Sequence, residues 1–208
     1  MNIRLAFLLI FLSFTHSFFS QTVTKDKTSL INKTSKTQTE QDNYIKILWL
    51  DENRIIQLNE DYIKTVTNQQ RAALGYIAAF VGNECEWDGA KNADESNLKC
   101  KLNYALELGY QCSDQQLSFL KKWFRKDKKI IENLQSCKKT PTSSSTIQDR
   151  FISLNMFTGD GVIKIIYSAV GVDLDKQRQW QWTEESTYSF TENQIIQSDR
   201  KNLNGGFY

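Results

Sequence analysis

Residues 146–172 read TIQDRFISLNMFTGDGVIKIIYSAVGV and decide the fold class. Isoleucine, valine, phenylalanine and tyrosine dominate both halves of the stretch, which is typical of β-strands. Gly159-Asp160-Gly161 separates the halves and offers the residues that a tight hairpin turn prefers. The stretch therefore predicts two antiparallel strands, Thr146–Phe157 and Val162–Val172.

The residues that follow extend this sheet. Gln179–Phe190 is rich in aromatic residues and predicts a third strand, and Glu192-Asn193 is a turn into a short last strand at Ile195–Gln197. Residues 204–208 are expected to form a loose tail. An antiparallel meander of three or four strands is the simplest arrangement.

The region before Pro141, the only proline, has helical periodicity instead. Apolar residues recur every three or four positions over Glu60–Glu84, which predicts one long central helix. Further helices are expected at Asn97–Leu108, closed by Gly109 at the C′ position, at Asp114–Lys126, behind a capping box of Ser113 and Gln116, and at Asp127–Ser136.

Two short apolar runs, Tyr44–Leu50 and Arg54–Leu58, precede these helices. Periodicity fits both a broken helix and a small hairpin, and we favour the helix. The predicted fold is α+β: a disulfide-pinned helical N-terminal part (43–139) packed with a C-terminal antiparallel meander (140–203), together one compact domain.

The N-terminus is typical of an exported protein. Residues 1–20 combine Arg4, an apolar run from Leu5 to Phe14 and a serine-containing end, which predicts a signal peptide. Residues 21–42 are mostly Thr, Lys, Gln and Ser and are expected to be a disordered tether. No other apolar run is long enough for a membrane span. We therefore expect a periplasmic or secreted protein.

All four cysteines, Cys85, Cys100, Cys112 and Cys137, follow the predicted signal peptide. An even number of cysteines in an exported chain favours two disulfides over free thiols, and there is no CxxC pair for a zinc site. Of the three possible connectivities we prefer Cys85 with Cys100 and Cys112 with Cys137, because each pair would join two neighbouring helix ends.

The chain has one histidine, His16, which lies in the predicted signal peptide. Without histidine, the Ser-His-Asp and Cys-His mechanisms have no base. There is also no P-loop and no GxGxxG motif. Removal of Arg4 leaves 25 basic and 24 acidic residues, a net charge of +1, which gives no support for a nucleic-acid partner. We expect no cofactor and no metal, and an enzymatic function is not indicated.

Two groups of residues remain as candidate sites. Alternation along Gln179–Phe190 places Trp180, Trp182 and Glu184 on one strand face, where they would line the core or contact a ligand. A carboxyl group surrounded by aromatic rings has a raised pKa, which suits it to act as a general acid. Glu184 is therefore the candidate for carboxylate chemistry.

The second group is basic. Lys121–Lys139 contains eight basic residues against Asp127 and Glu132. Helical spacing would place Lys121, Lys122, Arg125 and Lys128 on a connected surface, flanked by Phe119 and Trp123, that could meet an acidic protein or an anionic envelope surface. A solvated helix surface is the alternative interpretation.

The C-terminal pattern, a strand, a polar turn, a Trp-containing strand and then YSFTENQII at Tyr188–Ile196, is similar to the closing strands of NTF2-like domains. The likeness covers roughly Gly161–Asp199 and its motif is generic. It implies strands arranged around a ligand pocket, and no functional residue is carried over from it.

These observations predict an exported, non-enzymatic binding protein of unknown partner, an inhibitor or immunity protein being one concrete version. The alternative is a glycan- or small-ligand-binding protein, or a carboxylate-dependent glycan hydrolase, that uses Trp180, Trp182 and Glu184. The two differ in whether helices cover the aromatic strand face.

Overall fold

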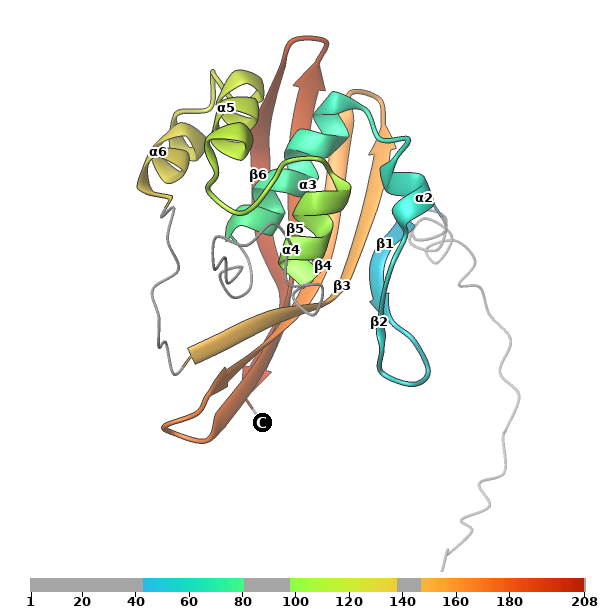
Figure 1. Ribbon diagram of the computed structural model, residues 1–208, viewed down its shortest axis with the longest axis vertical. Helices are drawn as coiled ribbons and strands as arrows, with labels where there is room; N and C mark the ends of the chain where they lie inside the picture. Colours follow the sequence, from blue (N-terminus) through green and yellow to red (C-terminus); the bar gives the residue numbers. More distant parts are fainter. Residues whose placement is uncertain (1–42, 81–97, 138–146, 208) are drawn as a thin grey trace, which may run out of the picture. The chain divides into compact units, whose positions relative to one another are not determined.

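The computed structural model describes residues 43–80, 98–137 and 147–207, and these residues form an α+β fold, as predicted (Figure 1). The strands are β1 (Ile45–Leu50), β2 (Ile56–Leu58), β3 (Ile147–Gly159), β4 (Val162–Asp173), β5 (Arg178–Thr191) and β6 (Gln194–Phe207). The helices are α2 (Glu60–Ile63), α3 (Asn68–Phe80), α4 (Leu98–Ala105), α5 (Asp114–Trp123) and α6 (Lys128–Ser136). The predicted signal peptide, the predicted tether and Cys85 lie outside the described residues.

The strands form one antiparallel sheet in the order β2-β1-β3-β4-β5-β6. The predicted hairpin between β3 and β4 is confirmed, with Gly159 paired to Val162. Asp160 and Gly161 both have positive φ angles, 50° and 73°, as a type I′ turn requires.

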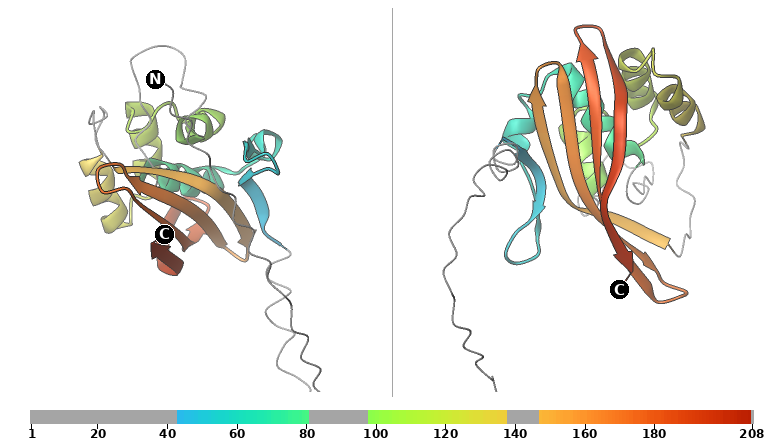
Figure 2. Two further views of the ribbon diagram at one scale, coloured as in Figure 1. Left: turned by 90° about the horizontal axis from the view of Figure 1, so that it is seen from below. Right: turned by 180° about the vertical axis from the view of Figure 1, so that it is seen from behind.

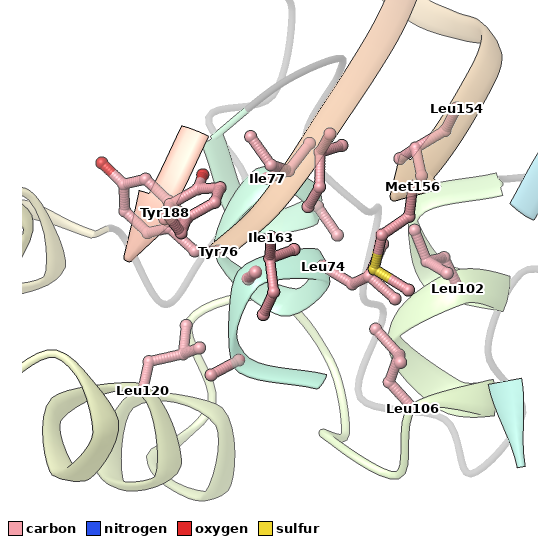
Figure 3. Packing of buried hydrophobic residues seen from close by; sticks show 14 of the residues in the cluster. Leu74, Tyr76, Ile77, Leu102, Leu106, Leu120, Leu154, Met156, Ile163 and Tyr188 are labelled. Carbon is pink, nitrogen blue, oxygen red and sulfur yellow. The ribbon is translucent and has the colours of Figure 1, made fainter. Parts of the chain in front are cut away.

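Helices α3 and α4 lie against one face of this sheet (Figure 2). Burial alternates residue by residue along β4, because successive side chains point to opposite faces. The buried set of β4 includes Ile163, Ile165 and Tyr167, all fully inaccessible. They belong to the same core as Leu74 and Ile77 of α3 (Figure 3). Helical and β parts thus share one hydrophobic core.

The preference for a helix at 44–58 is wrong, since β1 and β2 form the hairpin alternative. The Asp51 carboxylate accepts hydrogen bonds from the backbone N–H groups of Asn53 and Ile55, at 2.9 and 2.8 Å. Arg54 adopts a positive φ of 60° in the same turn. The local turn and the pairing of β1 with β3 therefore stabilise extended backbone over helix.

The single long helix predicted from Glu60 is also wrong, because α2 ends at Ile63 and α3 begins at Asn68. Thr67 and Gln70 form a capping box between them. Gln70 N–H donates to Thr67 Oγ1 at 3.3 Å, and Thr67 N–H donates to Gln70 Oε1 at 2.7 Å. This cap starts a new helix, which is central to the core as expected.

The end of α4 differs from its prediction as well. Glu107, with φ of 54°, occupies the C′ position that we assigned to Gly109. Its N–H donates to Tyr104 O, and the next N–H, of Leu108, donates to Asn103 O at 2.9 Å. These two bonds are the Schellman pattern. Gly109 follows in the next turn with φ of 72°.

Strand β6 is much longer than the predicted Ile195–Gln197 and includes residues 204–207, which we expected to be loose. Its side chains are exposed almost throughout, so apolar alternation could not reveal it. Pairing with β5 over its whole length supplies the order instead. The sheet has six strands rather than three or four because β1 and β2 join it beside β3.

The predicted Cys112–Cys137 disulfide is present and joins the start of α5 to the end of α6, with the two Cα atoms 5.7 Å apart. Cys100 is disulfide-bonded as well. The predicted partner of Cys100 is Cys85, which is outside the described residues.

Candidate functional site

The aromatic face of β5 divides into a covered half and an open half. The predicted alternation is correct, and Ser186 and Tyr188 are fully buried. Tyr188 packs on Phe124, the residue that caps the end of α5, with ring centroids 6.1 Å apart. The first part of β5 extends beyond α3 and α4 (Figure 1). Trp180 and Trp182 belong to this part and are half-buried, Trp182 against the edge of the core. Among the described residues, the helices therefore bury one half of the predicted aromatic face fully and the other half in part.

The open half lines a groove of about 570 Å³, which we call the aromatic groove. It is formed by Trp180, Gln181, Trp182, Asn202, Leu203, Asn204, Gly205, Gly206 and Phe207. All of these residues come from β5 and β6. Leu203 is 49 % exposed and Phe207 is 81 % exposed.

The groove exists because small residues surround the two indoles. Trp182 is paired with Gly205 on β6 and with Ala169 on β4, and Trp180 lies opposite Gly171 on β4. Directly paired side chains share one face of a sheet, so small partners leave room above the backbone. Phe207, opposite Trp180, adds bulk on that side.

Glu184 is held in a hydrogen-bonded cluster with Tyr167 and Arg200. Its Oε2 accepts from the Tyr167 hydroxyl at 2.5 Å and from Arg200 Nε at 2.6 Å. Burial, and then the hydrogen bond to Glu184, raise the pKa of Tyr167 above its usual range. The hydrogen bond to Glu184 likewise raises the pKa of Arg200. Two donors on one oxygen hold the Glu184 side chain in a fixed position within this cluster.

The predicted basic residues do lie together. Lys121 and Lys122 are in the last turn of α5, and Arg125 and Lys126 are in the short connection to α6. Lys128 and Lys129 begin α6. All six are exposed, and we call this surface the basic corner. Within the described ranges, none of the six forms a hydrogen bond or a salt bridge.

The two aromatic residues expected beside this surface have other roles. Trp123 is 8 % exposed and belongs to the core. Phe119 is half-buried, and the Arg71 guanidinium lies 4.7 Å from its ring centroid. Neither aromatic residue is therefore an exposed part of the basic corner.

A rigid support underlies the basic corner. The Asp127 carboxylate is buried between α6 and β6 and accepts two backbone hydrogen bonds. Ile130 N–H donates to Oδ1 at 3.1 Å and caps α6, while Gln197 N–H of the edge strand donates to Oδ2 at 2.8 Å. Together with the Cys112–Cys137 disulfide, this carboxylate fixes α6 to the rest of the fold.

Sequence reasoning missed Arg200, Leu203 and Phe207. Each lies on β6, and its relation to Glu184 or to the tryptophans depends on the register of β5 with β6. That register contains two irregularities, between Thr183 and Glu184 and between Thr187 and Tyr188. No sequence signal specifies such irregularities in a polar strand.

Among the residues that the structure describes, no three His, Cys, Asp or Glu side chains are grouped as metal ligands would be. None of the described helices combines the length and apolar character needed to cross a membrane. Comparisons with protein-family models, with curated proteins and with solved structures find no match to this chain.

Proposed function

We propose that this chain is an exported, non-enzymatic binding protein that recognises an acidic protein surface through the basic corner. The observation that carries the proposal is that six exposed cations share one corner of the fold and have no hydrogen-bond or ion-pair partner among the described residues. Elsewhere in the described residues, cations such as Arg71, Lys101 and Lys201 hold acidic partners. Unpaired like charges repel one another, and an acidic partner would relieve that cost.

The positions of two lysines support a role in binding. Lys128 and Lys129 occupy the first turn of α6, where the helix dipole is positive and cations are unfavourable. Only the Asp127 cap offsets this arrangement locally. Residues that lower helix stability without packing against anything are typical of binding surfaces, where function and stability compete.

A protein partner is favoured over a lipid surface. Peripheral helices that bind membranes present large apolar side chains beside their cations. None of the exposed large apolar side chains of the described residues lies on α5 or α6. The basic corner therefore offers charge alone, which suits an acidic surface on another protein.

The test compares two double charge reversals with the same change in net charge. Lys128→Glu/Lys129→Glu alters the basic corner, and Lys46→Glu/Arg54→Glu alters two exposed cations of the β1–β2 hairpin. The tagged protein is cross-linked in an envelope extract at low and high salt. We expect only the first variant to lose a salt-sensitive protein partner, because exposed charges are screened over about 8 Å at physiological ionic strength.

Stability is measured alongside capture. The reversal in α6 should raise the free energy of unfolding by about 0.5 kcal/mol or more per residue, since acidic residues suit a helix N-terminus. Loss of capture could then not be attributed to unfolding. Equal capture by both variants would refute the proposal. Binding to phosphatidylglycerol vesicles, with no protein captured, would refute the class of partner.

A further inference from the structure

The aromatic groove is a second candidate surface, and its chemistry differs from that of the basic corner. Its lining contains three aromatic rings, one leucine, two glycines and three carboxamides, and no ionisable side chain. Its volume of about 570 Å³ is in the range of small-molecule sites. An ionic ligand would find no counter-charge among these residues. The nearby Glu184 and Arg200 already neutralise each other at 2.6 Å.

The polar groups of the groove are available to a ligand. The side chains of Gln181, Asn202 and Asn204 form no hydrogen bond with any residue that the structure describes, and neither do the indole N–H groups of Trp180 and Trp182. Partly buried tryptophan N–H groups usually have a partner. Asn202, paired with Glu184, shares the face of Trp180 and Trp182, whereas Gln181 and Asn204 belong to the other face of the sheet. The Asn202 carboxamide offers both donors and an acceptor, which is the combination that hydroxyl groups require.

The aromatic floor adds a second requirement. Trp180 and Trp182 are successive residues on one strand face, so their backbone positions are about 6.7 Å apart. The faces of their rings carry partial negative charge and attract polarised C–H groups. A ligand that suits this floor has flat apolar faces repeated along its length, with hydroxyl groups at its edges.

From these features we infer that the aromatic groove binds a neutral oligosaccharide, with Trp180, Trp182 and Phe207 stacking on sugar faces and with the Asn202 carboxamide and the indole N–H groups binding hydroxyl groups. An acyl chain would leave the Asn202 carboxamide and the two indole N–H groups unpaired, at a cost in binding free energy. An acidic glycan would lack a cation among the lining residues. A neutral, repeating, hydroxylated ligand meets both conditions.

The experiment titrates the purified full chain separately with cellohexaose, chitohexaose and maltohexaose, followed by tryptophan fluorescence and by calorimetry. At least one of the three is expected to bind with a saturable change in fluorescence. Binding should persist at about 0.5 M salt, because no ion pair is involved.

Variants locate the binding. Phe207→Ala removes a side chain that is 81 % exposed, so the fold should tolerate it, and Trp180→Ala removes the first indole. Each is expected to weaken binding about tenfold or more, the scale of aromatic hot spots. Gln179→Ala, on the same strand but outside the lining, is the matched control and should bind as the unmodified chain does.

The inference is overturned if none of the three oligosaccharides binds, or if the two aromatic variants bind as tightly as Gln179→Ala does. Lys128→Glu/Lys129→Glu should leave oligosaccharide binding unchanged, because those residues lie outside the groove. This variant therefore separates a failure of oligosaccharide binding at the groove from a failure of protein binding at the basic corner.

Discussion

Replacement of Asp127 by alanine tests how α6 is fixed to the sheet. The Asp127 side chain is 7 % exposed and accepts two backbone hydrogen bonds, from Ile130 in α6 and from Gln197 in β6. Alanine removes both acceptors at once. Asparagine keeps the shape of the side chain but leaves a single oxygen acceptor, so one of the two N–H groups loses its partner.

The magnitude follows from these two bonds. Loss of an N-cap costs about 1 kcal/mol, and loss of a hydrogen bond to a charged acceptor costs about 1.5–3 kcal/mol. We therefore expect Asp127→Ala to lower the free energy of unfolding by about 3 kcal/mol and Asp127→Asn to lower it by roughly half as much. Glu132→Ala, an exposed residue one turn later in α6, removes the same charge and should cost about 0.5 kcal/mol or less.

Urea unfolding with the disulfides intact measures these differences. With a slope of about 2 kcal/mol per molar urea, Asp127→Ala should lower the midpoint by about 1.5 M. Amide hydrogen exchange of Ile130 and Gln197 then shows which bond asparagine keeps. If Asp127→Ala and Glu132→Ala shift the midpoint equally, the carboxylate does not fix α6 to β6 and the reasoning fails.

Three further perturbations test the core and the covalent frame. Gly75→Ala should lower the free energy of unfolding by about 1 kcal/mol, because overlap of the new Cβ with the Leu108 side chain outweighs the gain in helix propensity. In urea unfolding, the double variant Gly75→Ala/Leu108→Val should recover most of this lost free energy. Burial raises the pKa of Tyr167 in the folded state, so its stabilising contribution is complete below about pH 10 and is lost at higher pH. Above about pH 10 the free energy of unfolding should therefore fall with pH, and Tyr167→Phe should make this fall shallower by about 1.4 kcal/mol per pH unit. If the Tyr167 hydroxyl were accessible, the two proteins would show the same fall. Loss of the Cys112–Cys137 bond in Cys137→Ser should cost about 3.5 kcal/mol, from the 25-residue separation; thiol titration of the native unmodified chain should find no free thiol, and four would contradict the disulfides.

Local chemistry made several elements predictable. The Gly159-Asp160-Gly161 turn was predictable because positive φ angles favour glycine and aspartate, and the turn then fixes which residues of β3 and β4 face each other. The start of α5 was predictable from Ser113, whose Oγ accepts the Gln116 N–H at 3.1 Å. In both cases the decisive contacts lie within a few residues of one another.

Long-range pairing explains the failures. The hairpin at 45–58 depends partly on β1 pairing with β3, about 100 residues later in the chain. Strand β6 has few apolar residues, and its order comes from β5 and from Asp127. The open half of the aromatic face could be predicted as a face but not as a groove, because Gly205 and Phe207 reach it only through the β5–β6 register.

Strand β6 contributes to both candidate surfaces, and the stretch of β6 between them carries paired charges. Its first half is bound to Asp127 beneath the basic corner, and its last residues form one wall of the aromatic groove. Between them, Arg200 and Lys201 pair with Glu184 and Glu185 across the sheet, which cancels charge in the intervening stretch. These pairs add no net charge beside the groove, and dissolved ions screen exposed charges over about 8 Å at physiological ionic strength, so salt should weaken binding at the basic corner and leave binding at the groove unchanged.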